Sequence, residues 1–176
     1  MINKGSPLWQ YMSETQRQLC MDGELLLEDR KKHPNEKLSD YSYLVFPYAK
    51  LYEGFLKRLF LDLGIITERE YQSQHFRLGK VLSPNLITRL RTKSAFSQIR
   101  NRFGETLAFS LWNTWKQGRN MVFHYFPHNV RHLRIDEAIH TIEMIIGTMT
   151  EVVARTHPPH DQHKSSLAWG KGGGVS

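Results

Sequence analysis

Cysteine is almost absent from this chain of 176 residues, which contains a single one, Cys20. A lone cysteine excludes an intrachain disulfide and a zinc site built from cysteine thiolates, and it is typical of a reducing cytoplasm. Long apolar runs are also missing, since none approaches the roughly 20 residues that a bilayer-spanning helix needs. The sequence MINKGSPLWQ lacks the basic-then-apolar pattern of a secretory signal. We therefore expect a cytoplasmic protein with no membrane association.

Sequence patterns of cofactor and metal sites are missing as well. GKGGG near the C-terminus has no strand and helix around it, so it does not indicate a phosphate-binding loop. His124, His128 and His132 follow one another at four-residue steps, as in a helical zinc site. Pro127 argues against one continuous helix there, and no H-E-x-x-H motif is present. The sequence therefore predicts neither a cofactor nor a metal.

Positive charge is in excess, with 24 lysines and arginines against 17 acidic residues, a net charge of +7 and a pI near 9.6. This balance favours an anionic partner, of which nucleic acid is the commonest, although an ordinary basic protein is the alternative. The stretch 87–102 could line an RNA-binding surface through phosphate contacts, or it could be a solvated basic loop. It holds five cations and no acid: Arg89, Arg91, Lys93, Arg100 and Arg102.

Apolar residues recur at helical spacing along most of the chain, and no alternating strand pattern competes with them. Trp112 and Trp115, three residues apart, are predicted core residues for the same reason. The sequence therefore predicts an all-α bundle of four or five helices in one domain, residues 1–156, followed by a flexible tail, residues 157–176. Helices are expected over residues 7–29, 40–63, 67–81, 105–125 and from about 136 onward.

Local signals mark the ends of the most apolar of these helices, the one expected over residues 40–63. Ser39 or Asp40 can cap its first turn, and Gly64 can stop it. Pro47 should kink it, because proline lacks the amide donor and clashes with the preceding turn.

The segment QGRNMVFHYFP, residues 117–127, places three polar side chains in an apolar stretch. Asn120 and His124 are four residues apart, which puts them on one face of a helix. Arg119 would point roughly 140° away from His124 on a regular helix. It can still join them if Gly118 begins a new helical segment.

This trio of side chains suits cleavage of RNA without a metal. His124 could act as a general acid or base, and Arg119 could hold the pentacovalent phosphate with paired donors. Asn120 could orient the imidazole or bind the phosphate. The alternative is a partly buried histidine whose hydrogen bond is satisfied one helical turn back.

A second group of charges interrupts the most apolar expected helix. Lys50, Glu53 and Lys57 follow at spacings of three and four residues, so they share one helix face. This stripe is either a solvated face with helical ion pairs or a contribution to the same site as Arg119 and His124.

Three blocks in order resemble the HEPN domain of the RNase LS toxin family, of the RnlA/LsoA type. The blocks are YAKLYEGFLKRLFLDLG, FRLGKVL and LWNTWKQGRNMVFHYFP, and the resemblance spans roughly residues 40–155. Within the third block, RNMVFH has the R-(polar)-x3-H form of the motif that defines HEPN ribonuclease domains. The resemblance implies an all-α bundle that cleaves RNA without a metal.

The resemblance also assigns roles to particular residues. Arg119 and His124 fall on the two motif residues, and Glu53 falls on the family's acidic catalytic helper. Lys50 takes a place where a basic residue is expected, often arginine; lysine keeps the charge but loses the forked geometry. Members of the family act as homodimers, with two motif helices facing across a shared cleft, and a protein antitoxin holds them in check.

Two features depart from the family pattern. Full-length toxins of this family carry additional N-terminal domains, which a chain of this length cannot include, so a stand-alone HEPN protein with a different partner or target is an alternative. Another HEPN branch carries R-x4-H-x-Y, whose tyrosine is modified by a partner nucleotidyltransferase. Here Phe126 occupies that place and Tyr125 comes one residue early, which makes this branch the weaker match.

We therefore expect a metal-independent endoribonuclease of toxin–antitoxin or antiviral-defence type. Attack by the 2′-hydroxyl should leave a 2′,3′-cyclic phosphate. The alternative is a non-catalytic HEPN-like module that binds RNA or a partner protein, and a third class is a structural, antitoxin-type subunit. The candidate catalytic residues are Arg119, His124, Glu53, Asn120 and Lys50.

Overall fold

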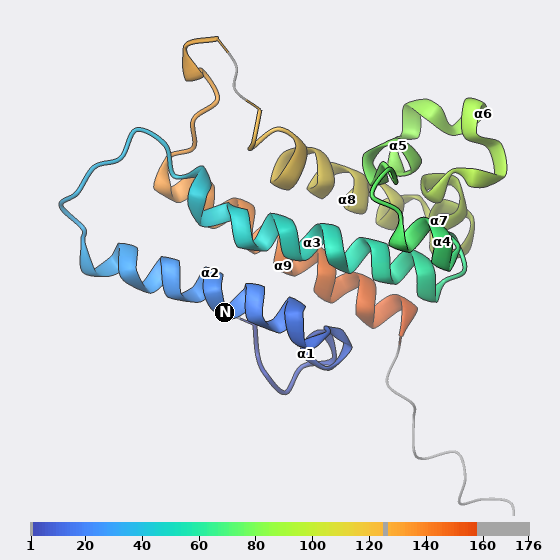
Figure 1. The fold of residues 1–176 in the computed structure, drawn as a ribbon, viewed down its shortest axis with the longest axis horizontal. Coiled ribbons are helices and arrows are strands. Elements are labelled where there is room, and N and C mark those ends of the chain that lie inside the picture. Colours follow the sequence, from blue (N-terminus) through green and yellow to red (C-terminus); the bar gives the residue numbers. More distant parts are fainter. Residues whose placement is uncertain (1, 125–126, 158–176) are drawn as a thin grey trace, which may run out of the picture.

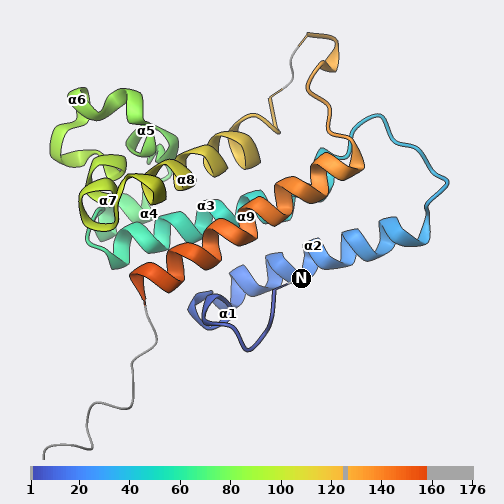
Figure 2. The same cartoon turned by 180° about the vertical axis from the view of Figure 1, so that it is seen from behind.

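The computed structural model describes residues 2–124 and 127–157, and all regular structure in these ranges is helical (Figures 1 and 2). The expected all-α bundle is confirmed, but the described residues form nine α-helices, more than the four or five expected. None of these helices is long and apolar enough to cross a membrane. The helices are α1 (Pro7–Tyr11), α2 (Glu14–Lys32), α3 (Ser42–Asp62), α4 (Glu68–Gln72), α5 (Leu78–Leu82), α6 (Ile87–Leu90), α7 (Ala95–Phe103), α8 (Glu105–Trp115) and α9 (Ile135–Thr156).

Two of the additional helices arise where an expected helix divides into two, and two more, α6 and α7, lie between residues 83 and 104, where no helix was expected. The helix expected over residues 7–29 becomes α1 and α2, because Ser13 starts a new helix. Its hydroxyl accepts a hydrogen bond from the Gln16 amide, and the Gln16 side chain accepts one from the Ser13 amide. The helix expected over residues 67–81 divides into α4 and α5. At Ser13, local capping therefore overrides the continuous apolar spacing.

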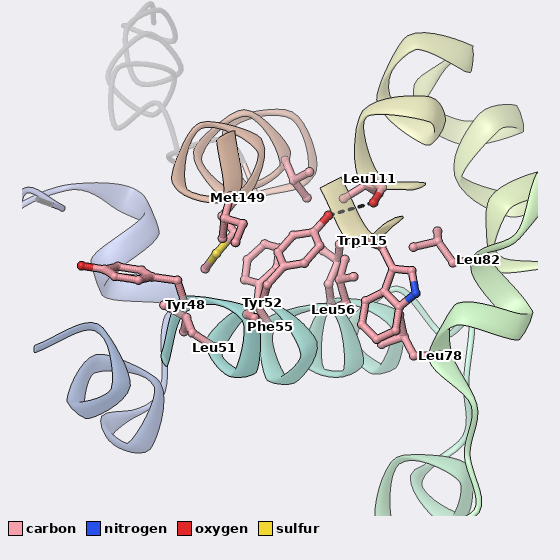
Figure 3. Close-up of a cluster of buried hydrophobic side chains, with 14 of the residues drawn as sticks. Tyr48, Leu51, Tyr52, Phe55, Leu56, Leu78, Leu82, Leu111, Trp115 and Met149 are labelled. Atoms are coloured by element: carbon pink, nitrogen blue, oxygen red, sulfur yellow. Dashed lines mark hydrogen bonds between the residues drawn. The ribbon is translucent and has the colours of Figure 1, made fainter. Parts of the chain in front are cut away.

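Helix α3 is the centre of the bundle and packs against α2, α9 and the segment after α8 (Figures 1 and 2). It continues past Pro47 to Asp62, and Gly64, with φ of +66°, lies just beyond its end as expected. Its aromatic residues Tyr48, Tyr52 and Phe55 are buried in the core that Figure 3 shows. Burying one such side chain stabilises the fold by about 1.5–3 kcal/mol.

A buried hydrogen bond joins α3 to α8. The Tyr52 hydroxyl is fully buried and donates to the Leu111 carbonyl oxygen at 3.0 Å (Figure 3). Since an unpaired buried hydroxyl costs about 1–3 kcal/mol, this bond favours one particular register of α8 on α3. The candidate residues that come after α8 are thereby placed relative to those on α3.

Asp40 connects the start of α3 to the segment before α9. Its Oδ1 accepts hydrogen bonds from the Ser42 amide at 2.9 Å and the Leu133 amide at 3.2 Å, and its Oδ2 accepts one from Asn129 Nδ2 at 3.2 Å. Partial burial raises the pKa of Asp40, but hydrogen bonds from Ser42, Leu133 and Asn129 outweigh burial and lower the pKa below its usual value. The residue at the N-cap position of α3 is Tyr41, which makes no side-chain capping hydrogen bond, so the expected cap at Ser39 or Asp40 is wrong; Asp40 instead accepts from the Ser42 amide at the first position of the helix.

Replacing Asp40 with alanine should destabilise the protein by about 1–2 kcal/mol at neutral pH, because four donors lose their acceptor: the amide and hydroxyl of Ser42, the Leu133 amide and Asn129 Nδ2. Since the pKa of Asp40 is lowered by folding, its contribution is complete above the ordinary aspartate pKa of about 4 and is lost as the pH falls through the lowered value. Urea unfolding at neutral and acidic pH measures both effects. Ser39→Ala, at an exposed neighbour, is the control. Equal stability of wild type and Asp40→Ala at neutral pH would contradict the assignment.

Candidate functional site

The backbone changes its hydrogen-bonding pattern just before the candidate residues. Helix α8 ends at Trp115, and Lys116–Asn120 form a π-helix in which the Met121 amide donates to the Lys116 carbonyl oxygen at 2.9 Å. The helix expected over residues 105–125 thus changes type after Trp115 and ends at Asn120, so the expectation is wrong for residues 121–124, and His124 lies outside any helix. Short π-helical segments are rare and are frequent at functional sites.

Gly118 allows the π-helix to lie directly against α9. A Cβ atom at this position would come within 2.9 Å of Ile145 Cγ1 and 3.0 Å of its Cδ1. The sequence predicted that a new helical segment could begin at Gly118. The helix type changes two residues earlier, at Lys116. The absent side chain thus sets the distance from the π-helix to the core, and with it the position of Arg119.

Arg119 and Glu53 form an ion pair between the π-helix and α3. Arg119 Nε donates a hydrogen bond to Glu53 Oε2 at 3.1 Å, and Arg119 Nη2 lies 3.1 Å from the same oxygen in the ion pair. The guanidinium also lies over the Trp115 ring, 5.3 Å from its centroid. The side chains of Arg119 and Glu53 are 38% and 32% exposed. The pair therefore holds the guanidinium in a fixed orientation while solvent, or a substrate, can reach it.

Two pockets meet at this ion pair. The Phe46 pocket has a volume of about 340 Å³, and the Trp115 pocket has a volume of about 350 Å³. Phe46, Ala49, Lys50, Glu53, Arg119 and Phe123 line the Phe46 pocket. Glu53, Phe76, Arg77, Leu78, Gly79, Lys80, Trp115, Arg119 and Asn120 line the Trp115 pocket. The site is thus built from α3, α5 and the residues just after α8.

Lys50 lies one helical turn before Glu53 and is exposed on the wall of the Phe46 pocket. The structure therefore brings Lys50, Glu53 and Arg119 together around one pocket. Lys50 and Glu53 share a face of α3, as their three-residue spacing predicted. Lys57 is partly buried and lines neither pocket, so the predicted stripe does not extend into the site beyond Glu53.

Asn120 and His124 form the second part of the candidate site. His124 Nε2 lies 3.3 Å from Asn120 Oδ1, and both side chains are exposed. Their expected pairing is found, although no helix connects them. Asn120 also lines the Trp115 pocket beside Arg119, whereas His124 lines neither pocket. Among the described residues, no hydrogen bond joins His124 to Arg119 or Glu53, so Asn120 is the link between the two parts.

Aromatic contacts hold the turn that carries His124. Phe123 packs edge-on against Phe46 of α3, with ring centroids 5.6 Å apart. No sequence signal marks this pair, because the two positions are far apart in the chain. The sequence predictions also missed Gly79 of α5. A Cβ atom there would lie 2.6 Å from Trp115 Nε1, and a glycine inside a helical pattern is the sequence signal for such close packing.

The three histidines at four-residue steps do not share a helix. His124 comes after the π-helix, His128 lies in the 3₁₀ turn Pro127–Asn129, and His132 lies in the loop before α9. Within residues 2–124 and 127–157, no group of three or more histidine, cysteine or acidic side chains could hold a metal ion. Tyr125 and Phe126, which bear on the R-x4-H-x-Y comparison, and residues 158–176 of the expected tail lie outside the described residues.

Comparison of the chain with protein-family models, with curated proteins and with solved structures finds no match.

Gly118→Ala should destabilise the protein by about 1–3 kcal/mol, because the new methyl group overlaps the fully buried Ile145. Gly147→Ala in α9 is the matched control. A Cβ atom there meets nothing within 4 Å, so it should gain about 0.5–1 kcal/mol from helix propensity. Denaturant unfolding gives both values. A Gly118→Ala protein as stable as the Gly147→Ala protein would show that the π-helix does not need the glycine.

Proposed function

We propose that this protein is a metal-independent endoribonuclease of the HEPN type. The observation that carries the proposal is the ion pair between Glu53 and Arg119, which presents an oriented guanidinium at the junction of two pockets, beside Lys50 and the Asn120–His124 pair. An oriented arginine with a nearby imidazole matches the needs of RNA cleavage, where a phosphorane must be stabilised and protons moved.

Each residue has a defined part in the proposed reaction. The 2′-oxygen of the substrate attacks phosphorus, the bond from phosphorus to the 5′-oxygen breaks, and the proton of the 2′-hydroxyl passes to a base while the leaving 5′-oxygen gains one. His124 acts as that base or as the acid. Arg119 donates to the oxygens of the phosphorane, Glu53 positions Arg119, and Lys50 adds positive charge. Asn120 positions His124. The products carry a 2′,3′-cyclic phosphate and a 5′-hydroxyl.

The site's partners belong to the same proposal. The resemblance to RNase LS toxins supports a cytoplasmic toxin or defence protein, a homodimer and a protein antitoxin as regulator. Phe46 and Phe123, which are 52% and 40% exposed beside the site, support self-association there, because exposed aromatic pairs are common at interfaces. A second copy would place a twin His124 near the same cleft.

Incubating the purified protein with labelled RNA in EDTA tests the activity. The wild-type protein should cut the RNA, and His124→Ala should lower the rate by about 100-fold to 10,000-fold, since it removes the proton-transfer group. Circular dichroism should show that this variant is folded, because His124 is exposed. His140→Ala, at an exposed position on α9, is the matched control and should retain full activity.

The same experiment separates the proposal from its alternative. Undiminished cleavage by His124→Ala would defeat the catalytic assignment. RNA affinity that falls with salt, without cleavage by the wild-type protein at any concentration, would favour a HEPN-like binding module. The binding module is supported by one observation: among the described residues, no hydrogen bond joins His124 to Glu53 or Arg119.

Self-association has its own test. Phe46→Glu should shift the protein from dimer to monomer in sedimentation velocity, because a buried carboxylate would face the apolar interface. Leu25→Glu, at another exposed apolar position, on α2, is the control and should leave the oligomeric state unchanged. A wild-type protein that sediments as a monomer would remove the homodimer from the proposal.

A further inference from the structure

A third pocket lies next to the candidate site and is lined by residues of α4, α5 and α6 and of the segments that connect them. These three helices lie together at one end of the bundle (Figure 1). The pocket's volume of about 680 Å³ is larger than that of the Phe46 pocket or the Trp115 pocket. We call it the basic pocket. Its charged and aromatic lining residues are Arg69, Glu70, His75, Phe76, Arg77, Lys80 and Lys93.

Positive charge dominates the lining of the basic pocket, where four cations face one carboxylate. The four cationic side chains are exposed, and none of the salt bridges among the described residues involves Arg69, Arg77, Lys80 or Lys93. The cations are therefore available to an anion from solution.

The single carboxylate of the basic pocket, that of Glu70, caps the N-terminus of α4. Glu70 Oε2 accepts hydrogen bonds from the amide and the hydroxyl of Thr67, both at 2.9 Å, which closes the capping box of α4. These bonds, the Thr67 amide first, lower the pKa of Glu70, and the charge of Lys93 adds to the effect. Glu70 therefore stays ionised in the cap and cannot neutralise all four cations.

The basic pocket is continuous with the candidate site. Phe76, Arg77 and Lys80 line both the basic pocket and the Trp115 pocket, whose far wall holds Arg119. The close approach of Gly79 to Trp115 fixes α5 between the two pockets, and Figure 3 shows Leu78 of α5 beside the same indole. One path of cations therefore leads from Arg119 along α5 to Lys93.

The lining of the basic pocket also offers apolar surface between its charges. Phe76 is partly buried, and Val81 and Leu90 complete this surface. Single-stranded nucleic acids are bound by this combination, in which cations meet the phosphates and apolar or aromatic side chains meet the bases. A duplex keeps its bases stacked inside, so it would use only the charges.

We propose that the basic pocket binds the segment of single-stranded RNA that flanks the scissile phosphate, with Arg77 and Lys80 bridging it to the site and with Arg69 and Lys93 at its far end. The inference rests on the proposed ribonuclease function and extends it to the form of the substrate. Of the stretch 87–102, whose charge suggested an RNA surface, Lys93 is the one cation that lines this pocket.

The test compares two charge-matched double variants. Arg69→Gln/Lys93→Gln changes the far end of the basic pocket, and Lys31→Gln/Lys32→Gln removes the same charge from exposed positions on α2. The probe is a fluorescein-labelled single strand of about ten nucleotides, long enough to span such a site and made resistant to cleavage by 2′-O-methyl groups. Fluorescence anisotropy across a salt series gives Kd and its salt dependence.

The pocket variant should bind the probe about tenfold more weakly. Its slope of log Kd against log salt should fall by about 1.4, as expected for two lost phosphate contacts on a single strand. The α2 variant should match the wild type. Cleavage of a dinucleotide, which reaches only the scissile phosphate, should be equal in all three proteins, whereas the pocket variant should cut a long RNA with lower kcat/KM.

Other outcomes separate this inference from the proposed function. Cleavage of long RNA with unchanged probe affinity in the pocket variant would overturn the inference and leave the ribonuclease intact. Loss of probe affinity without cleavage by any protein would support the pocket and remove the ribonuclease. Equal losses in both double variants, or a duplex that competes as well as the single strand, would overturn single-strand binding. A labelled oligoglutamate serves as a second probe. If the pocket variant lost affinity for oligoglutamate but not for the RNA probe, the pocket would be assigned to an acidic protein segment instead.

Discussion

The arrangement of the bundle follows from the burial of one face of α3. Tyr48, Tyr52 and Phe55 fill the core, and the Tyr52 hydroxyl binds the Leu111 carbonyl oxygen of α8. Once that face is buried, Lys50 and Glu53 lie at the partly exposed margin of the same helix. The register of α8 on α3 then fixes the path of the chain beyond α8, and the π-helix delivers Arg119 to Glu53. The candidate site is therefore a consequence of how two core helices pack.

The ion pair between Glu53 and Arg119 matters more for orientation than for stability. Both side chains are about one-third exposed, and ion pairs with that exposure contribute about 0–1 kcal/mol. A fold does not need such a pair, yet the hydrogen bond from Nε, the ion-pair contact of Nη2 and the Trp115 ring hold the guanidinium in one position. Preorganised donors of this kind stabilise a developing negative charge without having to rearrange during the reaction. The ion pair thus contributes more to the orientation of the Arg119 guanidinium than to the stability of the fold.

Close backbone packing shapes both sides of the site. Gly118 brings the π-helix against Ile145, and Gly79 brings α5 against Trp115. Each glycine has no Cβ atom where one would overlap a neighbour, so the two segments are held closer to the core than ordinary residues would permit. As a result, the cations of α5 and the guanidinium of Arg119 line one continuous surface.

The helical class of this protein and several local details of its helices can be predicted from the amino-acid pattern. Apolar spacing predicts the regions of α2, α3, α8 and α9, and the stop at Gly64 and the role of Asp40 near the start of α3 are marked by short-range signals. The pairing of Asn120 with His124 could also be predicted, because four residues separate them. These features depend on backbone hydrogen bonds and side chains within about one turn, which a local pattern records.

Tertiary structure alone decided the geometry of the site. The meeting of Glu53 with Arg119 joins positions on different helices, and helical spacing on either one carries no information about the distance between them. The π-helix depends on packing against Ile145, and the basic pocket depends on where α4, α5 and Lys93 come together. Such contacts arise from the way whole helices bury their apolar faces, so a pattern read along one segment cannot specify them.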